Sequence, residues 1–270
     1  MFLKLIFQAI SLLFNGFLGQ RLLESLNRGI LALSGIGNGA GVDKSGESSA
    51  IKNIFRYEKK EQYTVFDIGA NKGQFRKMAR ETLLSELSND GFVIYSFEPA
   101  KSTFEMLVKN FEEVERPYLK NLGLGKEKKS STLYYDKLGS TLASQSKRDL
   151  SFANIEMTME EQIEIDTLDS FCIENSISFI DLLKIDVEGY EMDVLQGAAQ
   201  MIQAKKIKSI MFEFGGTNID SRTYFKDFYH FFSKLEFKLY RITPLGYLYP
   251  LESYKEIYEQ FKTTNYLAIS

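Results

Sequence analysis

The chain has 270 residues, of which 44% are hydrophobic and 26% are charged, and its net charge at pH 7 is -3. These proportions are typical of a soluble globular protein with a sizeable core, and they disfavour a nucleic-acid partner, because that class usually carries a basic surface. The single cysteine, Cys172, and single histidine, His230, exclude a disulfide within the chain and a metal site built on several cysteines or histidines. A reducing, cytoplasmic location is expected.

The first segment with a clear pattern is apolar and runs over residues 2–18. Its polar residues Lys4, Gln8, Ser11 and Asn15 would share one face of a helix. The segment is short for a membrane span, which needs roughly 20 mostly apolar residues, and no Ala-x-Ala cleavage pattern follows it. It therefore predicts an amphipathic helix, and three roles stay open: packing on the protein body, peripheral contact with a membrane, or an anchor or signal.

A second helical pattern covers Arg21 to Leu33 and ends at a glycine-rich stretch that should break it. A loop then leads to a short helix near Ala50–Tyr57. We expect residues 1–60 to form a helical extension and residues 61–270 to form a single domain.

After residue 62, short apolar strands alternate with helices. The predicted strands cover residues 63–67, 92–97, 118–122, 131–135, 162–166, 180–187, 207–214, 237–242 and 266–269. Strands that alternate with helices indicate a parallel sheet covered on both faces, and a short connection suits the last two strands to an antiparallel edge pair. The predicted fold is α/β, a doubly wound, Rossmann-like sheet, mostly parallel with an antiparallel edge strand.

The turn after the first strand is the first place that indicates chemistry, because ligands of such sheets lie beyond the carboxyl ends of the strands. It reads Phe66-Asp-Ile-Gly-Ala-Asn-Lys-Gly73, in which Gly69 and Gly73 let the backbone approach a ligand. The middle glycine of the dinucleotide pattern Gly-x-Gly-x-x-Gly is missing. The turn favours a ligand with an amino acid and a nucleoside, whose ammonium Asp67 would meet.

A second acid, Glu98, ends the second strand 31 residues after Asp67, which is the length of one strand–helix–strand unit. A carboxylate at this place is positioned to accept hydrogen bonds from both hydroxyls of a ribose. The purely structural interpretation makes Asp67 a turn residue and Glu98 an acid at the N-terminus of the next helix. Together with the glycine turn, the two acids indicate a nucleoside cofactor.

Several segments of the chain resemble the FkbM family of methyltransferases over roughly residues 62–240. They are Phe66–Gly73, Ser96-Phe-Glu-Pro99, Thr167-Leu-Asp-Ser-Phe171, Ile180–Glu191 and Val194–Ala198, with Ser45-Gly-Glu47 before the first strand. The run Lys184-Ile-Asp-Val-Glu-Gly-Tyr-Glu191 is the most distinctive. The resemblance implies a class I methyltransferase fold, S-adenosylmethionine as the methyl donor, and O-methylation, often of sugar or polyketide hydroxyls.

The resemblance also implies residue roles at the donor. It assigns the methionine portion and the ribose to Asp67, Gly69, Ala70, Asn71, Gly73 and Glu98. Asn121 and the Ser140-Thr141 pair match family positions near the adenine or the edge of the active site. The Leu-Gly-Leu-Gly run at 122–125 departs from the alanine-containing sequence that is more usual there.

Methyl transfer to a hydroxyl requires positioning and a group that accepts the hydroxyl proton. Asp186 and Glu188 lie two residues apart at the end of the strand over 180–187, so they share a side if the strand persists, and Glu213 ends the neighbouring strand. Three such acids would form a base of raised pKa or an oxygen site for Mg²⁺. We expect Asp186 or Glu188 to accept the proton, with Glu213 third. The structural interpretation has Glu188 cap the next helix and Glu213 order a loop.

Two other classes of protein stay open. A nucleotide-dependent oxidoreductase or epimerase would need the dinucleotide glycine pattern and a Tyr-x-x-x-Lys pair, and neither stands in its place. A non-catalytic binding protein would keep the fold without needing Asp67, Glu98, Asp186 and Glu188 together. The sequence leaves open whether the acceptor is a glycan, a lipid-linked sugar or a small metabolite, and which oligomeric state the protein adopts.

Overall fold

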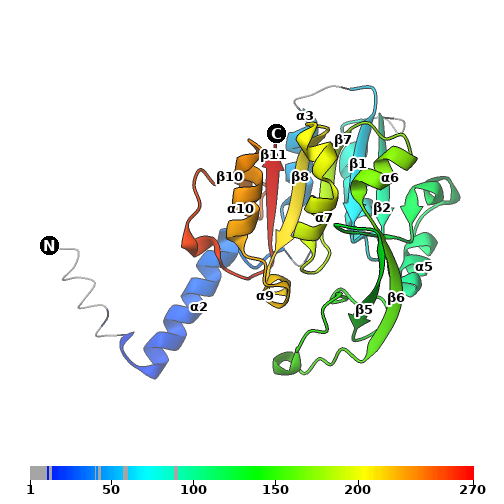
Figure 1. Ribbon diagram of the computed structural model, residues 1–270. Helices are drawn as coiled ribbons and strands as arrows, with labels where there is room; N and C mark the ends of the chain where they lie inside the picture. The colour runs from blue at the N-terminus through cyan, green and yellow to red at the C-terminus, as the bar shows by residue number, and fades with distance from the viewer. Residues whose placement is uncertain (1–10, 12–13, 40, 42–43, 57–59, 88–90) are drawn as a thin grey trace.

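The computed structural model shows an α/β fold around one large twisted sheet (Figure 1). The structure describes residues 11, 14–39, 41, 44–56, 60–87 and 91–270. Most of the helix predicted over residues 2–18 lies outside the described residues, which include only 11 and 14–18 of it.

The central sheet has eight strands in the order β10-β9-β11-β8-β7-β1-β2-β3. Five of them are mutually parallel: β1 (Tyr63–Ile68), β2 (Phe92–Phe97), β3 (Leu119–Lys120), β7 (Ile180–Ile185) and β8 (Ile207–Phe214). The chain order reverses between β1 and β7, where the sheet is wound in both directions from its centre. The doubly wound, Rossmann-like prediction is confirmed.

The inner strands are apolar on both faces because helices cover both faces. Side chains alternate along a strand, so neighbouring residues enter different cores. In β7, Leu183 packs with the helices α6 to α8 and α10, whereas Leu182 packs with α3 and α4. The bounds of these helices are α3 (Glu47–Arg56), α4 (Gln74–Leu84), α6 (Leu168–Glu174), α7 (Glu191–Gly197), α8 (Ala199–Gln203) and α10 (Phe225–Lys234).

A smaller sheet of three strands lies beside the main one, in the order β4-β6-β5. It is built from β4 (Gly123–Leu124), β5 (Lys129–Tyr135) and β6 (Met159–Asp166). Leu133, Ile163 and Ile165 form its own small core with Ala100, just before α5 (Lys101–Lys109). The long connection between β5 and β6 contains a 3-10 turn, η3 (Ser151–Ala153), and reaches toward the carboxyl ends of the central strands.

The last part of the chain departs from the prediction. The strands β9 (Lys238–Ile242) and β11 (Thr264–Ile269) do pair antiparallel, but β11 is inserted between β9 and β8, and the edge strand is β10 (Leu248–Pro250). The prediction of a short connection between these two strands was wrong, because the connection contains β10 and a 3-10 helix, η4 (Glu256–Tyr258). Burial explains the inner position of β11, since Tyr266, Leu267 and Ala268 are all buried.

Other short elements also differ from the prediction. The third strand keeps only the residues of β3, because a 3-10 helix, η2 (Glu113–Tyr118), precedes it. A short helix after β8, α9 (Thr217–Ser221), was not predicted.

The N-terminal part divides into two different pieces. The helix α3 packs against α4, and its residues Ala50, Ile51 and Phe55 share a core with Val65 of β1. The predicted boundary at residue 60 therefore separates residues that belong to one core. By contrast, α2 (Phe17–Leu33) extends away from the body and has no buried residue (Figure 1). Among the described residues, no helix has both the length and the apolar character needed to cross a membrane.

Candidate active site

A cavity of about 810 Å³ lies at the carboxyl ends of the central parallel strands. Its walls come from the turns that follow four neighbouring strands, which is where a doubly wound sheet binds its ligands. The predicted site residues that line it are Gly69, Ala70, Asn71, Glu98, Asp186, Glu188 and Glu213, together with Ser140 and Thr141. Most of the predicted donor and catalytic residues thus meet in one space.

The turn after β1 is fixed by backbone contacts. Gly69 has a positive φ of 80°, and its N–H donates to the carbonyl of Phe97 at 3.0 Å. A Cβ at this position would overlap the carbonyl oxygen of Asp186, and the Asp186 N–H in turn donates to the carbonyl of Ile68 at 3.0 Å. Glycine is therefore needed here so that the turns after β1 and β7 can touch.

We expect Gly69→Ala to lower the free energy of unfolding by roughly 2–4 kcal/mol, because the side chain adds both positive-φ strain and a backbone collision. Urea unfolding followed by circular dichroism measures this. Gly29→Ala is the matched control, since Gly29 is an exposed glycine of α2 with no atom within 4 Å of an added Cβ. A Gly69→Ala protein as stable as the control would contradict the assigned contact.

Glu98 reaches the turn after β1 from the end of β2. Its carboxylate accepts hydrogen bonds from the backbone N–H of Asn71 at 2.9 Å and of Ala100 at 3.0 Å. It therefore does stand at the N-terminus of α5, as the structural interpretation predicted, and it also lines the cavity. Glu98 is 6% exposed, and burial raises the pKa of its carboxyl to about 7.

Asp67, for which a contact with a ligand ammonium was predicted, is not among the residues that line the cavity. The residue has no exposed surface, and its Oδ1 lies 3.5 Å from Nζ of Lys184, which it faces across the β1–β7 ladder. Burial raises the pKa of Asp67, against the opposing effect of Lys184. The reason for its position is strand alternation, because Phe66 and Ile68 point into the opposite core.

Gly73 and Asn121 also lie outside the cavity lining. Gly73 precedes α4 with a φ of 88°, and an added Cβ would collide with Phe111 and Leu107. The side-chain amide of Asn121 donates to the carbonyls of Glu98 at 2.9 Å and Pro99 at 2.8 Å. Both residues thus shape the turns that line the cavity, in place of the direct donor contacts that the resemblance implied.

The three predicted catalytic acids come together. One carboxylate oxygen from each of Asp186, Glu188 and Glu213 lies within 4.8 Å of the others. Burial, together with the nearby charge of Asp186, raises the pKa of Glu188 and of Glu213 well above the usual range. Acids this close hold protons between them, since like charges disfavour full ionisation.

The expected cause of this proximity was wrong. The strand β7 ends at Ile185, and Glu188 has a positive φ of 53°, so a turn and not a continued strand brings Asp186 and Glu188 together. The carboxylate of Glu191 supports this turn by accepting from the N–H of Val187 at 3.2 Å and of Gly189 at 3.0 Å. The helix-capping role that the structural interpretation gave to Glu188 is not seen, because no described side chain caps the N-terminus of α7.

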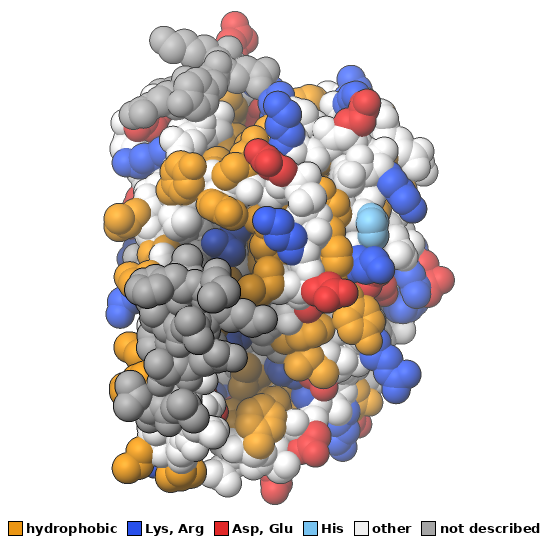
Figure 2. Space-filling model, turned by 90° about the vertical axis from the view of Figure 1, so that its left-hand side faces the viewer, with side chains coloured by type: hydrophobic (Ala, Val, Ile, Leu, Met, Phe, Trp, Pro, Cys, Tyr) orange, Lys and Arg blue, Asp and Glu red, His pale blue; other side chains and the backbone are white. Residues whose placement is uncertain are grey.

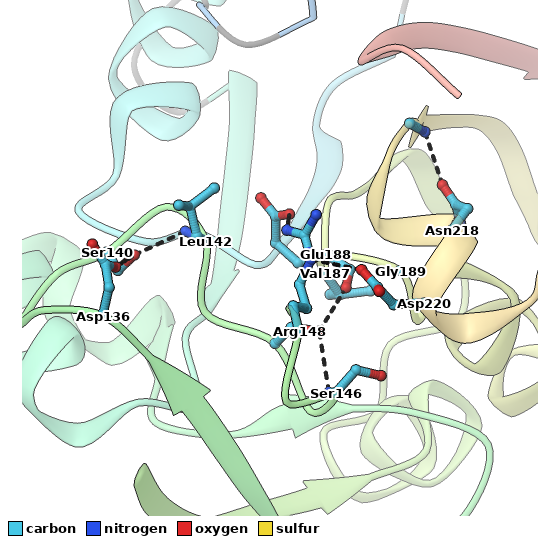
Figure 3. A network of polar contacts seen from close by, with 12 residues as sticks. Asp136, Ser140, Leu142, Ser146, Arg148, Val187, Glu188, Gly189, Asn218 and Asp220 are labelled. Atoms are coloured by element: carbon cyan, nitrogen blue, oxygen red, sulfur yellow. Dashed lines mark hydrogen bonds and ion pairs between the residues drawn. The ribbon is translucent and has the colours of Figure 1, made fainter. Parts of the chain in front are cut away.

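Two buried cations balance the acids. Nζ of Lys184 lies 3.2 Å from Oδ2 of Asp186, as the spacing of these residues suggested. Arg148 reaches in from the β5–β6 connection, with Nη1 3.9 Å from Glu188 and Nε 2.8 Å from Asp220 of α9 (Figure 3). The Ser144 hydroxyl donates to the backbone carbonyl of Glu188 at 2.8 Å. This connection therefore closes one side of the acid cluster.

Glu47, at the start of α3, also lines the cavity, although the sequence analysis did not place it in the site. It is 5% exposed and accepts a hydrogen bond from the Ser45 hydroxyl at 2.7 Å. Burial raises the pKa of its carboxyl to about 7, against the opposing charge of Lys184. The sequence did offer a signal for Glu47, because Ser45-Gly-Glu47 resembles the FkbM family. The expected domain boundary at residue 60, however, placed this segment outside the domain that holds the site.

A doubly wound sheet with an inserted antiparallel strand, and a cavity that joins a glycine turn to an acid after β2, define a Rossmann-like protein with a ligand site beyond its strand ends. A model of the Methyltransferase FkbM domain matches residues 67–242, which is more than half of the chain. The protein therefore belongs to the FkbM family of methyltransferases, as the sequence resemblance predicted. Of the classes that the sequence left open, the family supports an enzyme that transfers methyl groups.

Individual proteins match this chain over only part of its length or at low sequence identity. "Methyltransferase 1" of Beauveria bassiana (strain ARSEF 2860) is 31% identical over 148 residues, which are 49% of this chain and 57% of that protein. The match thus spans just over half the length of this curated relative. Among solved structures, the precorrin-6y C5,15-methyltransferase of Geobacter metallireducens GS-15 has a TM-score of 0.40 at 7% identity and covers 82% of this chain and 86% of its own. A human methyltransferase 10 domain containing protein has a TM-score of 0.40 at 10% identity, with 84% and 81% covered.

Proposed function

We propose that the protein transfers a methyl group from S-adenosylmethionine to a hydroxyl oxygen of a glycan or small-molecule acceptor. The observation that carries this proposal is the single cavity, which joins the glycine turn and Glu98 to the cluster of Asp186, Glu188 and Glu213. The donor would lie along the turn after β1 with its ribose at Glu98. The acceptor hydroxyl would then face the three acids.

The reaction is a displacement at carbon. The acceptor oxygen forms a bond to the methyl carbon while the carbon–sulfur bond breaks and leaves its electron pair on sulfur. The hydroxyl proton must pass to a base. Asp186 is our first choice because its charge is paired with Lys184 at 3.2 Å, whereas the raised pKa values of Glu188 and Glu213 favour their protonated forms. A protonated Glu188 or Glu213 would instead donate a hydrogen bond to the acceptor.

Mg²⁺ is the alternative occupant of the acid cluster. Carboxylate oxygens are the ligands that this ion prefers, and each of the three acids offers one. A bound ion would supply Lewis-acid chemistry: an acceptor hydroxyl held there would have a lowered pKa, and its proton could pass to water instead of to one of the acids. Treatment with EDTA separates the two mechanisms: loss of transfer, restored by added Mg²⁺, favours the ion, and unchanged transfer favours Asp186 as a base.

The proposal is tested by isothermal titration of the full chain with S-adenosylmethionine and, in parallel, with NAD. We expect a saturable response to the methyl donor alone. Tight binding of NAD without a response to the donor would overturn the proposal in favour of an oxidoreductase or epimerase. Binding of the donor without transfer of a labelled methyl group to any hydroxyl in a panel of sugars, polyketides and lipids would favour a non-catalytic binding protein.

Donor binding should depend on pH through Glu98. The ionised carboxylate accepts hydrogen bonds from both ribose hydroxyls, whereas the protonated form accepts them less well. Because the pKa of Glu98 is raised to about 7, donor affinity should rise as pH increases from 6 to 8. The ionised fraction changes about tenfold per pH unit below the pKa, so the expected gain is about tenfold. Titration of wild type and Glu98→Gln measures it, and an equal rise in both proteins would contradict the assignment.

A further inference from the structure

The helix α2 carries an apolar surface that no described part of the chain covers. Its apolar side chains recur at intervals of three and four residues, which places them on one side of a helix. We call this surface the apolar arc; it consists of Leu18, Leu22, Leu23, Leu26, Ile30 and Leu33. Exposure is high along its whole length, with Leu18 79%, Ile30 63% and Leu33 82% exposed. The opposite side carries Gln20, Arg21, Glu24, Asn27 and Arg28 together with two apolar residues, Phe17 and Leu31.

The width of the apolar arc distinguishes between two kinds of partner. At 3.6 residues per turn, its side chains span about 140° of the helix circumference. A seam between two paired helices is narrower, with apolar residues at only two of every seven positions. A helix that lies in the plane of a membrane surface has a broad apolar side and a charged polar side. The arc of α2 matches the second description.

The N-terminal segment and the rest of the chain have net charges of opposite sign. Residues 1–33 contain Lys4, Arg21 and Arg28 against Glu24, a net charge of +2, which leaves -5 for the rest of a chain whose total is -3. The residues before α2 are also mostly apolar. A positively charged, apolar segment is complementary to an anionic lipid surface, which offers it both acyl chains and negative charge.

We propose that α2 binds the protein to the surface of an anionic lipid bilayer, with the apolar arc at the boundary between head groups and acyl chains. The side of the molecule from which α2 extends also bears exposed apolar side chains (Figure 2). In the sequence, the apolar arc follows the apolar segment over residues 2–18. Membrane contact was one of the roles that the sequence left open for that segment.

The position of α2 relative to the cavity extends the proposal to the acceptor. The chain runs from Leu33 directly to Gly39 and Gly41, which line the cavity, and the N–H of Gly39 donates to the carbonyl of Thr263 at 2.9 Å. A bilayer bound by α2 would therefore lie near the cavity. Resting on the function proposed above, this places the acceptor hydroxyl on a lipid or a lipid-linked sugar.

The test is flotation of the full chain with vesicles, in the absence of any methyl donor. Vesicles of phosphatidylcholine alone are compared with vesicles that also contain phosphatidylglycerol. We expect the protein to float with the mixed vesicles and to be released by high salt. The triple variant Leu22→Gln, Leu26→Gln and Ile30→Gln keeps the charge and uses a good helix former, and it should lose about tenfold in the bound fraction.

The control changes two polar residues on the other side of α2: Gln20→Ala and Asn27→Ala. This control should bind vesicles within about twofold of wild type, because its apolar arc is intact. Arg21→Gln with Arg28→Gln should weaken binding to the mixed vesicles and leave any binding to phosphatidylcholine alone unchanged.

Two results would overturn the proposal: a wild-type protein that floats with neither vesicle, or an apolar-arc variant that floats as well as wild type. Light scattering after size exclusion identifies the competing occupant, since a dimer that the same variant dissociates, with no vesicle binding, would make the apolar arc an interface between copies. Donor titration of the variant should match wild type, so a failure of vesicle binding and a failure of the proposed methyl transfer are seen separately.

Discussion

Asp186→Asn should reduce methyl transfer by about 10²–10⁴-fold, the usual contribution of a positioned general base. Asparagine has almost the same shape as aspartate but cannot accept the hydroxyl proton. The donor should bind with unchanged affinity, because Asp186 is assigned to the acceptor side of the cavity. The measurement is the initial rate of transfer from labelled S-adenosylmethionine, alongside donor titration of the same protein.

The control for this variant is Asp193→Asn. Asp193 lies in the first turn of α7, outside the cavity lining, and its carboxylate is 3.9 Å from Lys126. This change should leave transfer near the wild-type rate. Full activity in Asp186→Asn would remove Asp186 from the mechanism, and Glu188→Gln and Glu213→Gln would then identify the remaining candidates. Loss of donor binding in Asp186→Asn would mean that the acid cluster belongs to the donor site.

Glu98→Ala should weaken donor binding by about 1–3 kcal/mol, the scale of a lost hydrogen bond to a charged group. This corresponds to about 5–150-fold in the dissociation constant. Titration of wild type and variant with S-adenosylmethionine measures the change. An unchanged dissociation constant would show that the ribose does not lie at Glu98.

Glu98 also accepts hydrogen bonds from the backbone N–H groups of Asn71 and Ala100, so its removal has a second effect, on the turn after β1. Glu98→Gln separates these effects, because the amide keeps one accepting oxygen for the turn but loses the charge. We expect intermediate affinity in Glu98→Gln and a melting temperature close to wild type. Glu105→Ala, on the exposed side of α5, is the control for removing an acid from this region and should change neither quantity.

The parallel strands were predictable because helices cover both faces of the sheet, so each strand appears in the sequence as a run of apolar residues. The strands over 92–97 and 207–214 have the predicted bounds. The place of β11 was not predictable in the same way, because local pattern specifies that a strand forms but not which neighbour it pairs with. β10 has only three residues, all at least partly exposed, and such a short edge strand has no apolar signature.

At the site, residue type was easier to predict than orientation. The cavity does contain the glycine turn, Glu98 and the three acids. Asp67 was assigned to the ligand because it ends a strand in the sequence, yet alternation with Phe66 and Ile68 directs it to Lys184. Arg148 gave no signal, because it lies in the irregular β5–β6 connection and reaches the acids only through tertiary structure.

The contact between Gly69 and the Asp186 carbonyl joins the glycine turn after β1 to the turn after β7, which carries Asp186 and Glu188. The Asp186 N–H donates to the Ile68 carbonyl, so the turn after β1 and the turn after β7 are held against each other by backbone contacts. In the reaction proposed above, these contacts would set the distance between the donor and the acid cluster. The β5–β6 connection closes another side of the cavity and contacts Glu188 through Arg148 and Ser144, so exchange of that connection would alter both the room for an acceptor and the support of Glu188.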